Sequence, residues 1–130
     1  NAIYLSDDSD EVLRKVRTAV TDPARIRKDD PGHPNVCTVY AYHKVFNHGF
    51  VPELTKMCKK GQIGCVECKK RLAAALNEML DPIREKRAYY DNHIDEVEDI
   101  LAAGTARAIE TGAQTLAEVK EAMKIDYFGK

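Results

Sequence analysis

Four cysteines carry the clearest chemical signal in this sequence of 130 residues. They stand at Cys37, Cys58, Cys65 and Cys68, so their spacing is C-x20-C-x6-C-x2-C. Four thiolates are common ligands of a tetrahedral zinc ion or of an iron–sulfur cluster. We therefore predict that the four cysteines converge on one metal centre.

Three other uses of the cysteines fit the sequence less well. Structural disulfides are typical of small secreted domains, but we see no secretory signal, and 44% hydrophobic residues are enough for a core. A redox C-x-x-C pair requires a βαβ context, and strand signals are nearly absent here. Burial of the thiols as small apolar groups does not explain three cysteines within eleven residues.

The spacing leaves zinc and iron–sulfur both open. A zinc site of four cysteines usually contains two C-x-x-C pairs, whereas here only Cys65 and Cys68 form such a pair. The separate approach of Cys37 and Cys58 is better suited to a wider four-iron cluster, in which each iron takes one cysteine. The spacing alone gives iron–sulfur only a small preference.

The segments that position the cysteines are predicted to be helices. The capping box of Asp8 and Glu11 begins a first helix, which ends before Pro23. Its inward side chains are predicted to be Val12, Val16, Ala19 and Val20. Residues 21–34 are predicted to form a loop, because they contain three prolines, a glycine and many charges.

Two shorter helices and a turn follow. Asn35 caps a helix that runs to about Asn47, and a third helix covers residues 52–60 with proline at its start. The side chains predicted to point inward from the second helix are Val36, Val39, Tyr40 and Val45. Gly61 and Gly64 then interrupt the pattern and allow the loop to wrap around a metal centre without steric cost.

A long helix begins near Val66 and places Cys65 and Cys68 at its start, where backbone amides can stabilise thiolate charge. Its apolar stripe consists of Leu72, Leu76, Met79, Leu80 and Ile83. Pro82 lies inside this pattern and should kink the helix, because it removes one hydrogen bond.

The C-terminal part carries two further helical patterns. The first ends near Gly104 and contains Ile94, Val97, Ile100 and Leu101. The second contains Ala106, Ile109, Ala113, Leu116 and Met123. Together the patterns predict one all-α domain, a helical bundle of about five to six helices with a cysteine-rich metal loop.

Positive charge gathers beside the predicted metal loop, although the whole chain has a net charge of only −1. The basic residues between positions 56 and 71, where Glu67 is the only acid, are Lys56, Lys59, Lys60, Lys69, Lys70 and Arg71. A second basic group consists of Arg14, Lys15, Arg17, Arg25, Arg27 and Lys28. These residues could bind phosphates, or they could form a solvated face that compensates an anionic cluster.

The sequence shows no catalytic constellation. It contains neither a P-loop nor the G-x-G-x-x-G and G-x-S-x-G motifs. The four histidines form no i, i+4 pair, and we interpret them as surface or core residues: His33, His43, His48 and His93.

Segments on both sides of the cysteine loop carry recognisable motifs. They are RTAVTD at residues 17–22, PGHPNVC at 31–37, LDPIREKRAYY at 80–90, and the segments 100–107 and 119–123. Together they resemble the C-terminal part of bacterial tryptophanyl-tRNA synthetases, over nearly everything from Ile3 onward. The block at 82–85 is shared with tyrosyl relatives, but the cysteine array speaks against a tyrosyl enzyme.

The resemblance implies a function for residues 3–130. They would be the C-terminal helical domain that recognises the tRNA anticodon in a cytoplasmic, usually homodimeric class I enzyme, which charges tRNA with tryptophan. In a subset of that family four such cysteines hold a 4Fe–4S cluster, so this cluster becomes the first choice and zinc the alternative. The basic residues at positions 56–71 become candidates for tRNA contacts.

The catalytic part of that family is not found in this sequence. Its HIGH-type and KMSKS-type motifs do not occur, so we expect the Rossmann domain that uses ATP and magnesium to be absent, and these residues to be inactive alone. Asn1 and Ala2 are interpreted as the remnant of an expression tag. Neither a membrane segment nor a DNA partner is expected. The alternative is a free-standing iron–sulfur or zinc protein with a regulatory or sensor role.

Overall fold

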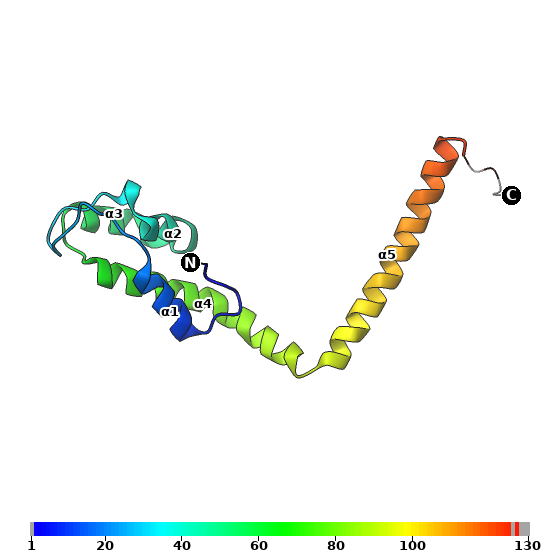
Figure 1. Cartoon of the computed structure of the whole chain (residues 1–130), viewed down its shortest axis with the longest axis horizontal. Coiled ribbons are helices and arrows are strands. Elements are labelled where there is room, and N and C mark those ends of the chain that lie inside the picture. Colours follow the sequence, from blue (N-terminus) through cyan, green and yellow to red (C-terminus); the bar gives the residue numbers. More distant parts are fainter. Residues whose placement is uncertain (1, 126, 128–130) are drawn as a thin grey trace. The chain divides into compact units, whose positions relative to one another are not determined.

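The computed structural model describes residues 2–125 and residue 127. These residues contain five α-helices, two short 3-10 helices and no β-strand, which confirms the all-α prediction (Figure 1). The chain divides into two compact units, residues 1–86 and residues 87–130. Asn1, the first residue of the predicted tag remnant, lies outside the described part.

The first helix, α1, spans Ser9–Thr18 and begins where the capping box predicts. The Asp8 carboxylate accepts a hydrogen bond from the backbone N–H of Glu11 at 2.7 Å, which satisfies one of the free donors of the first turn. Val20 is 68% exposed, because α1 ends two residues before it, so its predicted inward position is wrong.

The start of the second helix differs from the prediction. Asn35 lies in a 3-10 helix, η1 (Pro34–Val36), and α2 (Thr38–Phe46) begins only after Cys37, which is its N-cap residue. Pro34 suits the first turn of η1, because it has no backbone N–H to satisfy there.

The inner face of α2 differs from the predicted stripe. Val39 is buried and Tyr40 is half-buried, as predicted. Val36 and Val45, both expected to point inward, are 62% and 67% exposed. The inner face instead contains His43, which is fully buried.

The helices around the glycine turn agree with the prediction. After η2 (His48–Phe50), α3 spans Val51–Lys59 with proline in its first turn. The long helix α4 spans Cys65–Asp91 and continues through Pro82. One proline removes one hydrogen bond but keeps a helical φ, so the helix can continue; the kink stays a prediction.

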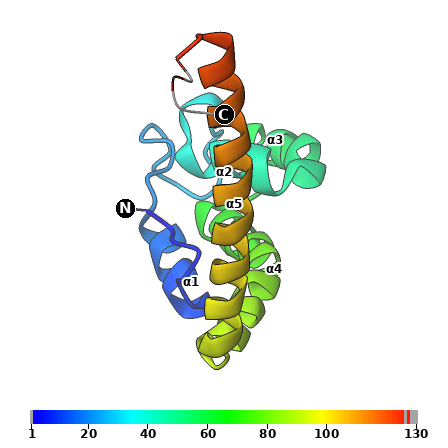
Figure 2. The same ribbon diagram turned by 90° about the vertical axis from the view of Figure 1, so that its right-hand side faces the viewer.

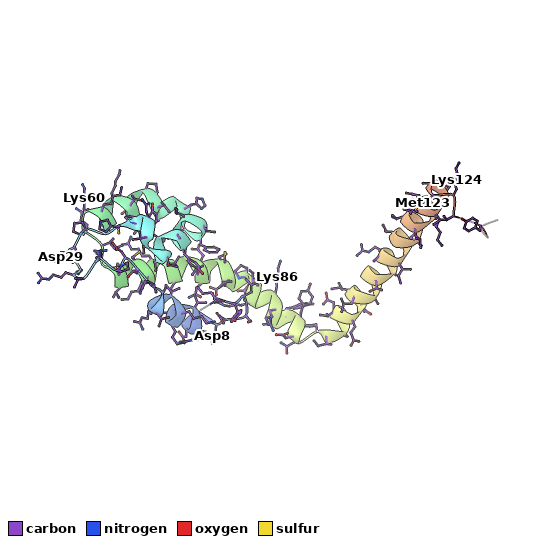
Figure 3. The ribbon with its side chains drawn as sticks, turned by 45° about the horizontal axis from the view of Figure 1, so that its top comes forward. Asp8, Asp29, Lys60, Lys86, Met123 and Lys124 are labelled. Carbon is purple, nitrogen blue, oxygen red and sulfur yellow. The ribbon has the colours of Figure 1, made fainter. Side chains whose placement is uncertain are left out.

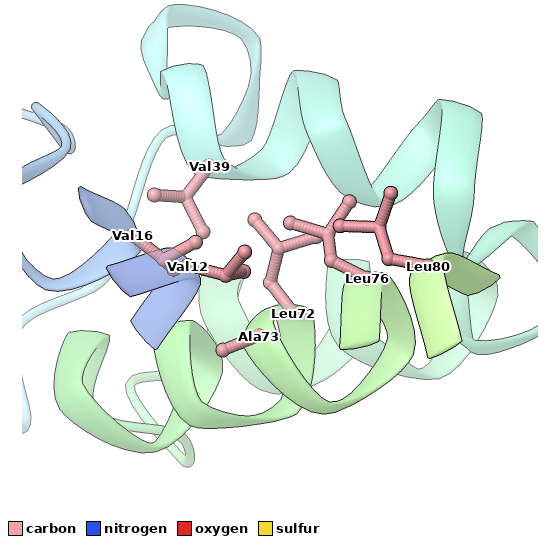
Figure 4. Packing of buried hydrophobic residues seen from close by; sticks show 7 residues of the cluster. All are labelled: Val12, Val16, Val39, Leu72, Ala73, Leu76 and Leu80. Atoms are coloured by element: carbon pink, nitrogen blue, oxygen red, sulfur yellow. The ribbon is translucent and has the colours of Figure 1, made fainter. Parts of the chain in front are cut away.

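The apolar core of the first unit joins three helices. Figure 4 shows seven apolar side chains in contact, two from α1, one from α2 and four from α4. They are Val12, Val16, Val39, Leu72, Ala73, Leu76 and Leu80. Met79 and Ile83 of the predicted stripe remain 40% and 39% exposed.

The second unit contains one helix where two were predicted. Figure 2 shows α5 (Ile94–Ala122) as one continuous helix. Gly104 lies within these bounds, so the helix end predicted there is wrong. A glycine inside a helix costs only about 1 kcal/mol relative to alanine, which helical residues on both sides can outweigh. None of the residues of α5 is buried, so the predicted bundle is confirmed only in the first unit, where the core joins α1, α2 and α4. Within the described residues, no helix is both long and apolar enough to cross a membrane.

Candidate metal centre

All four cysteines lie at helix ends. Cys37 is the N-cap residue of α2, and Cys58 lies in the last turn of α3. Cys65 is the first residue of α4, and the N–H of Cys68 donates to the Gly64 carbonyl at 3.0 Å. Three of the four sulfurs are therefore carried by helix N-termini, where the helix dipole favours negative charge such as that of a thiolate.

The four cysteines line one cavity and are free thiols. The other residues that line this cavity are Thr21, Asp22, Arg25, Tyr40, Leu54 and Ile63. Its volume is about 20 Å³, which is room for about one water molecule. The ends of three helices, α2, α3 and α4, thus bring the predicted ligands together.

The thiols are gathered but do not form a coordination sphere. Within the described residues, no group of three or more His, Cys, Asp or Glu side chains is placed to hold a metal ion. A tetrahedral zinc ion with Zn–S bonds of about 2.3 Å requires sulfurs about 3.8 Å apart. The donor set fits a zinc ion or an iron–sulfur cluster chemically, and either would require the thiols to adjust.

Burial favours the protonated form of two of the four thiols. Burial, together with the neighbouring cysteines, raises the pKa of Cys68 to about 12. Burial also raises the pKa of Cys58, although the nearby Arg25 opposes the shift. A bound metal supplies the positive charge that stabilises thiolates, so metal binding here should release protons.

Two glycines allow close backbone approaches around the cysteines. The N–H of Gly32 donates to the Cys58 carbonyl at 2.9 Å, and a Cβ added at Gly32 would lie 2.5 Å from the Cys58 sulfur. Gly61 has a φ of +67°, and a Cβ there would collide with the Asp29 carbonyl. Figure 3 shows Asp29 and Lys60 at the same end of the first unit. Gly61 was predicted from the sequence, whereas Gly32 was not.

The loop that lines the cavity is fixed by Asp22, a residue that the sequence analysis named only within a motif. Asp22 is 6% exposed and accepts hydrogen bonds from the backbone N–H of His33 at 2.7 Å and from its Nδ1 at 2.9 Å. It also accepts from the N–H of Ala24 at 3.0 Å, which is an Asx turn. The hydrogen bond from the His33 backbone is the main cause that lowers the pKa of Asp22.

This pKa shift predicts an acid-dependent loss of stability. The folded protein stabilises the ionised form of Asp22. The resulting contribution to the free energy of unfolding is complete above the unfolded-state pKa of about 3.9. It is lost as the pH falls through the lower pKa of Asp22 in the folded state. We expect Asp22→Asn to unfold at lower denaturant concentration than the parent at pH 7, with the difference narrowing below pH 4. Urea unfolding followed by circular dichroism measures this. Asp99→Asn, an exposed change on α5, is the control; an Asp22→Asn difference that is constant with pH would contradict the prediction.

His43 supports Cys68 from the inner face of α2. Its Nε2 lies 3.2 Å from the Cys68 carbonyl and 3.5 Å from the Cys68 sulfur, while Asn47 Nδ2 lies 3.3 Å from Nδ1. These partners assign the proton to Nε2, with Nδ1 accepting from Asn47. Burial lowers the pKa of His43, so the ring is neutral near pH 7. The expectation of a core histidine is confirmed here.

Arg25 connects three parts of the site. Its Nη2 donates to the Ile63 carbonyl at 2.6 Å and to the Lys28 carbonyl, and its Nη1 points to the Cys65 sulfur at 3.8 Å. Its Nε is buried and has no hydrogen-bond partner among the described residues. The sequence analysis placed Arg25 only in a general basic group, because local sequence cannot show contacts with residues about 40 positions away.

The predicted tRNA-contact residues divide into two sets. Lys69 donates to the Arg17 carbonyl at 2.8 Å, and Arg71 pairs with Glu67 at 3.0 Å and stacks on Phe50. The remaining four are exposed on α3, at its C-cap and on α4, and no ion pair is found for them in the described part of the chain: Lys56, Lys59, Lys60 and Lys70. In the second basic group, Arg14 and Lys15 are paired with Glu11 and Asp7.

Comparison with known protein families places this all-α region in a class of enzymes. Residues 1–81 match the family described as tRNA synthetases class I (W and Y). The chain therefore belongs to this family.

Within the family, the chain is similar to tryptophan–tRNA ligases. The chain is 40% identical to that of Aquifex aeolicus over 127 residues, which cover 96% of this chain and 32% of the relative. It is 42% identical to that of Treponema pallidum over 125 residues, 95% of this chain and 37% of the relative. For Thermotoga maritima the identity is 36% over 129 residues, 96% of this chain and 39% of the relative. The chain thus spans about a third of the length of these relatives and corresponds to one region of each.

Proposed function

We propose that residues 3–130 are the C-terminal helical domain that recognises the anticodon in a tryptophan–tRNA ligase. The similarity to tryptophan–tRNA ligases over 96% of the chain carries this proposal. It also favours a ligase region over a free-standing sensor protein. The full-length enzyme would charge tRNA with tryptophan in the cytoplasm as a homodimer, and a separate catalytic domain would use ATP and magnesium.

The exposed lysines support an RNA-binding role for the cavity end of the first unit. Lys59 and Lys60 follow directly after Cys58, and Lys70 follows Cys68 by two residues. Lysines bind phosphates as point charges, and an anticodon is a single-stranded loop whose unstacked bases are open to side chains. The rigid helix ends at the cavity would hold these lysines in a fixed arrangement.

The four cysteines are proposed to hold a 4Fe–4S cluster, with zinc as the alternative. When bound, the cluster supplies a fixed cross-link between loops and a centre that can accept one electron. Cys37 and Cys68 pack against the apolar core, so these two ligands are held by the fold itself. Cys58 and Cys65 flank the glycine turn, and their positions would adjust when the metal binds.

Anticodon-dependent binding tests the proposed function. We expect the 130-residue chain, in its metal-loaded form, to bind a tryptophan tRNA transcript at least tenfold more tightly than the same transcript with a changed anticodon. Filter binding or anisotropy at constant salt measures the difference. The chain alone should give no tryptophan-dependent pyrophosphate exchange. Equal affinity for both transcripts, or exchange activity by these residues, would contradict the assignment.

A further inference from the structure

Arg25 has one donor that the protein leaves unused. A buried N–H without an acceptor costs roughly 1–3 kcal/mol, so such groups are rare in folded proteins. Nε of Arg25 is such a group within the described residues, and Arg25 lines the cysteine cavity. An acceptor supplied by whatever the cavity binds would satisfy it.

The rest of the guanidinium is fixed in place. The two Nη2 contacts, to the Ile63 and Lys28 carbonyls, tie the loop before α4 to the loop before η1. Nη1 lies 3.8 Å from the Cys65 sulfur, which is an N–H···S contact. The positive charge is therefore held at the cavity by backbone contacts, and a side chain fixed in this way loses little entropy when a ligand arrives.

We infer that Arg25 is a positioning residue that donates hydrogen bonds to the sulfur atoms of the metal centre and raises its reduction potential. This inference rests on the proposed 4Fe–4S cluster. Four thiolates and an oxidised cluster carry a net charge of about −2, and reduction adds one more negative charge. A fixed cation with N–H···S contacts stabilises the reduced form more than the oxidised form, so it favours reduction.

Arg25→Gln and Arg25→Lys separate this role from a structural one. The chain is reconstituted anaerobically with iron and sulfide, its iron and sulfide are counted, and the cluster is titrated with dithionite under electron paramagnetic resonance. We expect Arg25→Gln to bind the cluster but to shift the one-electron reduction equilibrium about tenfold toward the oxidised form, a potential about 59 mV lower. Arg25→Lys keeps the positive charge and should lower the reduction potential less than Arg25→Gln does. Arg27→Gln, an exposed arginine in the same loop that does not line the cavity, should leave it unchanged.

The outcomes distinguish the inference from the proposed function. If the parent chain takes up no iron, or only zinc, the cluster proposal fails and this inference fails with it. If the parent takes up about four irons but Arg25→Gln has the parent's potential, only the inference is overturned. Loss of helical circular dichroism in both Arg25 variants would show that Arg25 is merely a structural tie, which also overturns it. Loss of cluster binding by Arg25→Gln, with normal helix content and binding by Arg25→Lys, would support it.

Discussion

Anaerobic preparation should yield a brown chain with about four iron and four sulfide ions, and Cys58→Ser or Cys65→Ser should remove the colour. Serine oxygen is a poor ligand for the soft iron of a cluster, so loss of one thiolate should release it. The loop around Gly61 and Gly64 should loosen as well, because its ends carry these two proposed ligands. Absorbance, metal analysis and limited proteolysis between α3 and α4 measure the effects.

Met57→Leu, on the turn of α3 that contains Cys58, is the matched control and should keep the colour. A colourless parent with one zinc ion per chain and protected thiols would favour the zinc alternative. If the parent is colourless, binds no metal, and all four thiols react freely with a thiol reagent, the cysteines only pack in the cavity. In that case the proposed metal centre is wrong.

Lys59→Glu combined with Lys60→Glu should raise KM for tRNA at least tenfold in a full-length ligase that carries this region. Both lysines are exposed at the end of α3, so the change reverses charge without disturbing the core. Tryptophan activation should not change, because it takes place in the catalytic domain. Two lost phosphate contacts should also reduce the slope of log affinity against log salt by about 1.4, at roughly 0.7 per single-stranded phosphate.

The control for charge alone is Arg107→Glu combined with Lys120→Glu, two exposed residues on α5. This double variant changes the net charge by the same amount as the lysine double variant, but it should leave KM for tRNA near that of the parent. Aminoacylation and pyrophosphate exchange, measured at several salt concentrations, separate tRNA binding from activation. If the lysine variant binds tRNA like the parent at every salt concentration, the lysines form only a solvated face.

Local signals predicted the helices better than their contacts. The capping box at Asp8 and the proline in the first turn of α3 act over one turn, so their sequence pattern was sufficient. The break predicted at Gly104 failed, because the small helical penalty of one glycine does not decide where a long helix ends. Val45 was misplaced because it follows Val39 by six residues, which is about 240° around a helix of 3.6 residues per turn, so the two cannot share one face.

In the candidate site, too, local sequence signals were predictive and contacts between distant residues were not. Cysteine spacing predicted that four thiols meet, and they line one cavity. The second layer of the site could not be predicted, because Arg25 reaches residues 38 and 40 positions away and His43 reaches one 25 positions away. Such contacts depend on the packing of α2 and α4, which a periodicity argument does not resolve.

Cys37 and Cys68 pack against the apolar core, whereas Cys58 and Cys65 stand on α3 and at the glycine turn. A ligand that binds only the native state adds stability according to its free concentration. The proposed metal would therefore stabilise the two parts of the first unit unequally. The part built on α1, α2 and α4 has its own hydrophobic core, whereas the end of α3 and the turn after it would depend on the proposed metal. Iron supply in the cell would therefore set how often this edge of the domain opens, and with it the fraction of molecules able to hold an anticodon.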